Sequence, residues 1–233
     1  MLPIWKRYYS RYFDLEDMYV LDNMTTGGSL HAMNDITVRK IESPMCWDNH
    51  WMKNFVMYYQ RKLLEKYEYV LYTDVDEIVI PDPLVYRDLK HYIQTFDGVP
   101  KDTMSYEIVH DIDNENPLNF MNPINLQREN WFKRLNRWGK VVLANQPLNW
   151  NVRMHACHQN PNHIKDPNLY LLHLSMMDLD IWSQRRKDQI KDLPVKEPSW
   201  THSLTDKTLV EKFLREQFLK TEKIPEHIRA VRI

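Results

Sequence analysis

The sequence predicts an α/β protein in which a central, mainly parallel sheet carries helices on both faces. Segments with strand patterns alternate with segments whose apolar residues recur at helical spacing, which is typical of parallel sheets joined by crossover helices. Residues 69–73, Tyr-Val-Leu-Tyr-Thr, are nearly continuously apolar, as in a strand buried on both faces of such a sheet. Of the 233 residues, 43% are apolar and 27% charged, so we expect one globular domain over residues 1–233.

Short β-prone runs mark the expected strands. They lie at residues 18–21, 35–41, 69–73, 103–110, 140–144 and 169–174. Turn-prone residues 25–29 follow the first run, and Pro81-Asp82-Pro83 stops a short apolar step at 78–80. Residues 111–125 form a long polar loop in this interpretation.

Helical periodicity predicts the remaining elements. We expect helices at residues 2–12, 49–67, 84–95, 180–192 and 205–219. The longest has Phe55, Tyr59 and Leu63 at helical spacing. The last begins near a hydroxyl residue and carries a Glu211–Arg215 pair at i,i+4, which supports a helix.

Charge and composition exclude several classes of partner. Lys and Arg total 31 against 32 Asp and Glu, so the net charge of −1 creates no field that would attract nucleic acid. The four glycines form no G-x-G-x-x-G or Walker phosphate loop. No apolar run approaches the ~18–20 residues of a membrane helix, and the start lacks a secretory signal, so we expect a cytoplasmic protein without a transmembrane segment. Cys46 and Cys157 are expected to be buried thiols, with a disulfide as the alternative.

The strongest chemical signal is Thr73-Asp74-Val75-Asp76-Glu77, at the end of the most apolar strand. Residues two apart in an extended chain project to the same side, so Asp74 and Asp76 can converge on one point. Two close carboxylates repel each other, and Mg²⁺ or Mn²⁺ would compensate their charge while leaving positions for water and phosphate oxygens. We therefore expect a metal site on Asp74 and Asp76, and a solvated acidic turn is the alternative.

Residues 69–77, followed by Ile80-Pro81, resemble the DxD region of GT-A-fold glycosyltransferases, in particular the family-2-like and domain-of-unknown-function-23-like groups. The resemblance runs from Leu2 to about Arg186, because residues 2–5, 19–29, 127–140 and 171–174 fall in the family's order. It implies a GT-A-type, Rossmann-like sandwich. The family's first strand is expected to be absent from this sequence, and residues from about 195 to 233 are expected to form a helical C-terminal extension.

The resemblance also implies roles for individual residues. Asp76 would bind the metal that bridges the donor diphosphate, and Asp74 would contact the ribose or a metal-bound water. His173 would complete the metal or diphosphate site, while Asp22 and the adjacent Asn23 would lie near the nucleotide. Two basic residues, Arg128 and Lys140, are expected to neutralise phosphate, since cationic side chains suit that task; a solvated face is the alternative for their segment.

Transfer to a hydroxyl needs a group that accepts the proton of that hydroxyl. The candidates are Glu107, Asp111, Asp113, Glu115 and His155, and we take Glu107 and His155, with Asp74 and Asp76, as the catalytic set. The spacing of His155 and His158 matches no standard zinc site. Trp131 and Trp150 could stack on a sugar ring, although large aromatic residues commonly fill the core.

The resemblance thus implies a Mn²⁺- or Mg²⁺-dependent, inverting hexosyl- or deoxyhexosyltransferase. Its donor would be a UDP- or GDP-linked sugar and its acceptor a hydroxyl of a glycan or glycoprotein, with no nucleic-acid partner. The metal would stabilise charge that develops on the leaving diphosphate. Two other classes stay open: a Mg²⁺-dependent phosphohydrolase that uses the Asp74/Asp76 pair, and a non-catalytic carbohydrate-binding domain of a larger protein.

Overall fold

The computed structural model describes residues 1–233 apart from 24, 26–27, 43–47, 135–138 and 192–205. Its contacts divide the chain into two compact units. Unit 1 comprises Met1–Ser105 and Leu135–Leu171, and unit 2 comprises Tyr106–Arg134 and Leu172–Ile233. None of the helices in the described ranges is long and apolar enough to cross a membrane, as the sequence predicts.

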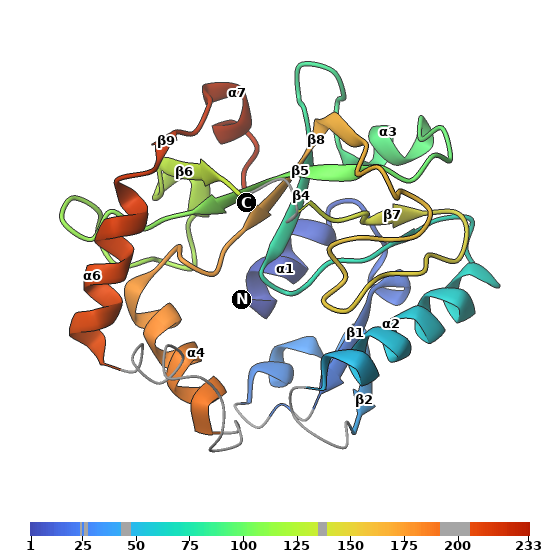
Figure 1. Cartoon of the computed structure of the whole chain (residues 1–233), viewed down its shortest axis with the longest axis horizontal. Helices are drawn as coiled ribbons and strands as arrows, with labels where there is room; N and C mark the ends of the chain where they lie inside the picture. Colours follow the sequence, from blue (N-terminus) through green and yellow to red (C-terminus); the bar gives the residue numbers. More distant parts are fainter. Residues whose placement is uncertain (24, 26–27, 43–47, 135–138, 192–205) are drawn as a thin grey trace. The chain divides into compact units, whose positions relative to one another are not determined.

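Unit 1 contains most of the short strands (Figure 1). Its elements are α1 (Leu2–Tyr9), η1 (Leu15–Asp17), β1 (Tyr19–Asn23), η2 (Ser29–Met33), β2 (Thr37–Ile41), α2 (Asn49–Leu64), β3 (Val70–Leu71), β4 (Glu77–Pro81), α3 (Leu89–Gln94) and β7 (Leu143–Ala144), with the first parts of β5 (Asp102–Ile108) and β8 (Lys165–His173). β1 and β2 pair in parallel, with Tyr19 opposite Thr37 and Asn23 opposite Ile41. The two-residue strands β3 and β7 pair antiparallel.

Helix α1 is held against β4, the strand that follows the predicted carboxylate site. The Tyr8 hydroxyl donates to the carbonyl oxygen of Val79 at 2.7 Å. The amide of Val79 donates to the Tyr9 hydroxyl at 3.0 Å. Because both tyrosines and β4 are buried, these bonds satisfy backbone groups that would otherwise be costly to bury.

Helix α2 begins at an N-cap and buries one face in the core of unit 1. The Asp48 carboxylate accepts a hydrogen bond from the amide of Trp51 at 2.9 Å, which satisfies one of the free amides of the first turn. The core cluster beneath the helix contains Val56, Met57, Val141, Ala144, Leu148, Trp150, Met154 and Cys157. Cys157 is a buried free thiol, as predicted; Cys46 lies outside the described residues.

The main sheet has five strands in the order β4-β8-β5-β6-β9. β6 (Asn130–Lys133) pairs antiparallel with β5 on one side and with β9 (Glu222–Lys223) on the other. The sheet is mostly antiparallel, so the predicted central, mainly parallel, Rossmann-like sheet is wrong. The chain is instead a mixed α/β protein with small sheets.

Two local features explain this error. The apolar run at 69–73 forms only the two-residue strand β3, and its Tyr72 packs on the core cluster beneath α2 rather than inside a parallel sheet. Residues 109–129, which join β5 to β6, contain a loop and the short turn η3 (Ile124–Leu126) instead of a crossover helix. A parallel connection needs a crossover, so this segment returns the chain antiparallel.

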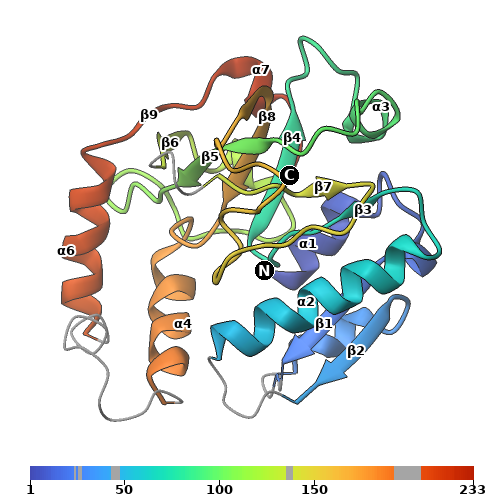
Figure 2. The ribbon, with the colours of Figure 1, turned by 45° about the vertical axis from the view of Figure 1, so that its right-hand side comes forward.

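Unit 2 packs a helix pair on its own apolar cluster. Helices α4 (Leu179–Lys191) and α6 (Lys207–Phe218) lie side by side in both views (Figures 1 and 2). Between them Trp182 and Phe213 stack with ring centroids 5.1 Å apart. The unit ends in β9 and α7 (Glu226–Arg229). The helices predicted near 2–12, 49–67, 180–192 and 205–219 are confirmed, while α3 is shorter than the predicted 84–95.

Candidate active site

The two predicted metal ligands lie in a tight turn between β3 and β4 of unit 1. The amide of Asp74 donates to Glu77 Oε2 at 2.9 Å, and the amide of Glu77 donates to the carbonyl of Asp74 at 3.0 Å. Upstream, the indole of Trp5 donates to Thr73 Oγ1 at 2.9 Å. These bonds fix the backbone that carries the carboxylates.

A buried lysine sits beside this turn. Lys140 Nζ lies 2.9 Å from Asp74 Oδ2 and 2.8 Å from Glu77 Oε2, and the lysine side chain is 0% exposed. Burial alone would lower the pKa of Lys140, but the carboxylates of Asp74 and Glu77 raise it above its ordinary value. The ammonium is therefore charged at neutral pH and holds both carboxylates.

Asp74 is the accessible carboxylate of the group, with 45% of its side chain exposed. The Tyr72 hydroxyl donates to its Oδ1 at 2.8 Å. Burial alone would raise the pKa of Asp74, and the charge of Asp76 adds to this effect, but Lys140 and Tyr72 together hold the pKa below its ordinary value. Asp74 is thus ionised well below neutral pH.

Asp76 is buried, with 5% exposure. Its negative charge adds to the effect of burial, which is the largest one, in raising the pKa of Asp74 and of Tyr72. Asp74, Asp76, Glu77 and Lys140 carry a formal charge of −2, from three carboxylates and one ammonium. This cluster of four, with Tyr72, is named the Lys140 cluster.

The Lys140 cluster fits a metal that shares its ligands with a substrate, not a metal caged by protein. In the described part of the chain, no three His, Cys, Asp or Glu side chains come together as a metal site. Mg²⁺ typically takes one or two carboxylates and completes its shell with water and substrate phosphates. Asp74, with its exposed carboxylate, is the residue best placed to supply one of them, Asp76 is a buried candidate for the second, and the residual negative charge favours a cation.

The nucleotide-site candidates lie on the parallel pair of unit 1. Asp22, near the end of β1, is 5% exposed, and its Oδ1 accepts a hydrogen bond from the amide of Thr25 at 3.0 Å. Asn23 is the last residue of β1. Leu21, next to Asp22, packs on the same core cluster as Tyr72.

Trp150 belongs to that core rather than to a sugar-stacking surface. It is 2% exposed, its indole donates to the Val141 carbonyl at 3.3 Å, and its ring lies 5.4 Å from that of Tyr72. Trp131, in unit 2, is 1% exposed and stacks on Tyr106 at 4.0 Å. The core-filling alternative therefore holds for both tryptophans.

His155 is half-buried in the turn that follows Trp150.

Unit 2 holds the other acid–base candidates in two groups. Glu107, 1% exposed, accepts hydrogen bonds from Ser175 Oγ at 2.9 Å and the Met176 amide at 3.1 Å, and its Oε2 lies 2.7 Å from His173 Nδ1. A carboxylate at Nδ1 fixes the tautomer and orientation of an imidazole, which is the arrangement of many metal-binding and base-catalytic histidines. Glu107 thus positions His173.

Arg128 is also buried in unit 2, with a side chain 1% exposed. Its guanidinium donates to the carbonyls of Met177, Asn116 and Gln127 and lies 3.4 Å from Asp178 Oδ2. These contacts hold the Arg128 side chain among the loops of unit 2. Asp111, Asp113 and Glu115 lie in the same loop region, and Asp113 pairs with Arg215.

Sequence reasoning missed the roles of Tyr72 and Glu77. A weak signal for each was present, since Tyr72 precedes Asp74 by two residues, the spacing of one strand face, and Glu77 directly follows Asp76. The partnership of Glu77 with Lys140 gave no such signal, because 63 residues separate them in the sequence.

Comparison of the chain with protein-family models, with curated proteins and with solved structures finds no match.

Proposed function

We propose that the chain transfers a hexosyl or deoxyhexosyl group, with inversion, from a UDP- or GDP-linked donor to a hydroxyl of a glycan or glycoprotein. The observation that carries this proposal is an ionised, half-exposed Asp74, two residues before the buried Asp76, in a cluster of net negative formal charge. The resemblance of residues 69–81 to glycosyltransferase DxD regions supports the same activity.

The charge of the cluster explains why a metal-bound diphosphate suits it. The residual −2 charge would repel a diphosphate alone. A divalent cation would be attracted to the Lys140 cluster and would bind both the cluster and the diphosphate. When bound, Mn²⁺ or Mg²⁺ supplies a fixed positive charge for the leaving nucleoside diphosphate. Asp74 and Asp76 would hold the cation, and Asp22 and Asn23 are our candidates for contacts to the nucleoside.

Lys140 acts on Asp74 rather than on phosphate in this proposal. Its ammonium is wholly buried and already bonded to Asp74 and Glu77. By neutralising these neighbours it keeps Asp74 ionised and oriented, which is the form that a cation needs. Tyr72 supports the same orientation through its hydrogen bond to the other carboxylate oxygen.

Hydrolysis of nucleotide-sugars tests this proposal, because donor cleavage in water needs no acceptor. We expect slow Mn²⁺-stimulated release of sugar from a UDP- or GDP-sugar by the full chain. Asp76→Asn should lower that rate by about 10²-fold or more, as does the loss of other charge-stabilising groups. Asp14→Asn, at an exposed aspartate of unit 1, should not change it. Metal-independent cleavage, or equal rates in Asp76→Asn, would reject the proposal.

One observation favours the phosphohydrolase as a second candidate. An ionised, accessible carboxylate next to a lysine, as at Asp74, is also a plausible nucleophile toward a phosphate ester. Both oxygens of Asp74 already accept hydrogen bonds, which lowers their nucleophilicity and favours the role in cation binding. Release of inorganic phosphate from p-nitrophenyl phosphate with Mg²⁺, lost in Asp74→Asn, would select the phosphohydrolase.

A further inference from the structure

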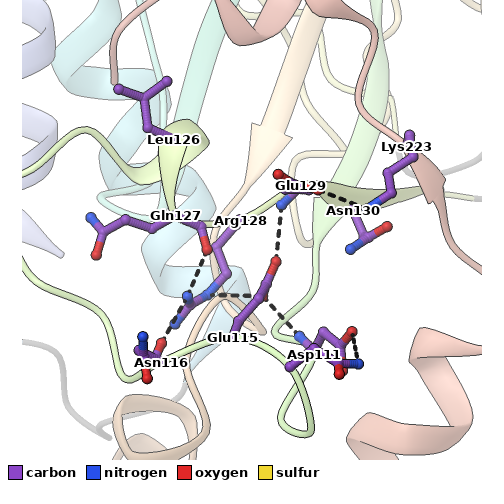
Figure 3. Close-up of a pocket in the computed structure, with 10 residues that line it drawn as sticks. Asp111, Glu115, Asn116, Leu126, Gln127, Arg128, Glu129, Asn130 and Lys223 are labelled. Carbon is purple, nitrogen blue, oxygen red and sulfur yellow. Dashed lines mark hydrogen bonds and ion pairs between the residues drawn. The ribbon is translucent and has the colours of Figure 1, made fainter.

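A polar pocket of about 470 Å³ lies wholly within unit 2. It is lined by Asp111 and residues 114–116 of the loop, by the segment 126–130 and by Lys223 (Figure 3). Its volume falls within the ~300–1,000 Å³ of small-molecule sites. None of its residues belongs to the Lys140 cluster, so it is a separate candidate site.

The charged side chains of the pocket are neutralised within the protein. Arg128 lies 3.6 Å from Glu115 and 3.4 Å from Asp178. The two Glu115 oxygens accept hydrogen bonds from the amides of Asp111, at 2.9 Å, and Glu129, at 3.1 Å. Since these groups are already satisfied, Arg128 is not available as an anion receptor and Glu115 is not available as a cation ligand.

On the outer rim, Glu129 is neutralised by cations, and Asp111 is held by neutral hydrogen-bond donors. Glu129 pairs with Lys223 at 2.8 Å and with Arg229 at 3.2 Å, and Lys223 chiefly lowers the pKa of Glu129. Asp111 accepts hydrogen bonds from the amide of Asp113 and, at 2.8 Å, from the side chain of Asn114. Three lining carboxylates, Asp111, Glu115 and Glu129, stand against two cations, Arg128 and Lys223, so the lining has a formal charge of −1 and does not attract an anion.

What the pocket does offer is side-chain amide groups. Asn130, in β6, is only 7% exposed, yet its side chain has no hydrogen-bond partner among the residues that the structure describes. Figure 3 shows its amide pointing away from β6 toward the loop that carries Asp111 and Glu115. Asn116, across the pocket, also has a side chain without a partner within the described ranges. The Asn130 amide is not among the buried polar atoms that lack a partner, and Asn116 is an exposed residue, so both amides are open to the pocket. A ligand that both donates and accepts hydrogen bonds can replace water at these two amides.

We propose that this pocket binds a neutral sugar residue of the acceptor glycan. Sugar hydroxyls both donate and accept hydrogen bonds, as do the amides of Asn116 and Asn130, and they need no charged partner. The exposed Leu126 side chain gives the wall an apolar part suited to the C–H groups of a sugar ring. The pocket chemistry identifies a neutral polyhydroxyl ligand, and its assignment to an acceptor rests on the proposed function.

Saturation-transfer NMR on the full chain tests the inference with defined probes. The probes are the methyl glycosides of glucose, galactose, mannose and N-acetylglucosamine and the disaccharides lactose and cellobiose, with methyl glucuronide and glucosamine as charged counterparts. We expect at least one neutral probe to bind, and Asn130→Leu, which keeps the number and branching of the side-chain heavy atoms but removes the amide, to weaken binding by about tenfold or more. Asn116→Ala, at an exposed loop position, should weaken it without a risk to folding. Asn122→Leu, outside the pocket, is the matched control.

The possible outcomes separate this inference from the proposed function. Absence of binding by every neutral probe, binding of charged probes alone, or binding unchanged in both Asn130→Leu and Asn116→Ala would overturn the inference. Donor hydrolysis is measured independently on the Lys140 cluster. Sugar binding at Asn130 without any donor hydrolysis would therefore retain the pocket and reject the transferase, and the reverse result would retain the transferase alone.

Discussion

The ammonium of Lys140 lies 2.9 Å from the carboxylate of Asp74, although one residue is wholly buried and the other is 45% exposed. The contact joins the interior of unit 1 to the accessible end of its acidic turn. Lys140 compensates the charges of Asp74 and Glu77 from inside, and the outer side of Asp74 stays open. A carboxylate of this kind can accept a cation without losing its structural support.

Lys140→Met should destabilise the chain strongly. The substitution leaves the buried Glu77 carboxylate without its charge partner, and breaking a buried pair in this way costs ~3–5 kcal/mol. Urea unfolding followed by fluorescence measures the change. Lys90→Met, at an exposed lysine of unit 1, should change the unfolding free energy by less than about 0.5 kcal/mol. Equal effects of the two substitutions would contradict the assigned role of Lys140.

Asp74→Asn should reduce stability more at pH 6 than at pH 3. The folded pKa of Asp74 lies below its unfolded value of about 3.9, so its stabilising contribution is complete above that value and is lost as pH falls through the folded pKa. Solvent screens the half-exposed Asp74, so we expect the loss of unfolding free energy in Asp74→Asn to be larger at pH 6 than at pH 3 by only about 1 kcal/mol. Paired unfolding curves of the native chain and the variant across this range measure it. A constant difference would show that Asp74 has an ordinary pKa.

Gly139→Ala should disturb the position of Lys140 through a backbone clash. A Cβ at residue 139 would lie 2.9 Å from the carbonyl oxygen of Thr103 and 3.1 Å from Asp102 Cβ. The amide of Thr103 also donates to the carbonyl oxygen of Lys140 at 3.0 Å. A shift of the Thr103 backbone would therefore also move the backbone of Lys140. We expect a loss of ~1–3 kcal/mol, as for other overpacked sites, measured by urea unfolding. A neutral effect would show that this segment is loosely packed.

Arg128→Met should destabilise unit 2 by about 3–5 kcal/mol. The variant loses three hydrogen bonds to backbone carbonyls and leaves the buried Asp178 without its cation. Hydrogen exchange of amides in the loop at 111–116 reports the change locally. Arg232→Met, at an exposed arginine of the same unit, is the control and should have little effect. Retained stability in Arg128→Met would favour a ligand-binding role for this residue.

Local elements of this fold could be predicted from sequence, while the pairing of its strands could not. The helices α1, α2, α4 and α6 follow from periodic apolar residues, because a helix buries one face wherever it packs. The apolar run at 69–73 predicted a strand buried on both faces, but only Val70 of the run is buried, and an apolar run does not reveal the direction of the neighbouring strand. The helix-free segment 109–129 was the available sign of an antiparallel return from β5 to β6.

In the candidate site, too, sequence patterns point to residues close together in the chain but not to contacts between distant residues. Asp74 and Asp76 are candidates because two carboxylates two residues apart next to an apolar run are a local pattern, although the structure places them at a turn and not in a strand. The partnership of Lys140 with Asp74 spans 66 residues, and no local pattern encodes it. Lys140 was therefore expected at phosphate, as an exposed cation would be, whereas its burial assigns it to the carboxylates.

The measurement that tests the metal-dependent nucleotide site most directly is a thermal-shift panel of UDP and GDP with and without Mn²⁺. A ligand that binds only the folded chain stabilises it by about 2.7 kcal/mol at 100 times its Kd. We predict that one nucleotide raises the Tm of the native chain only when Mn²⁺ is present, and that Asp76→Asn abolishes this rise while Asp14→Asn retains it. No rise with either nucleotide, or the same rise in Asp76→Asn, would contradict a metal-dependent nucleotide site at Asp74 and Asp76.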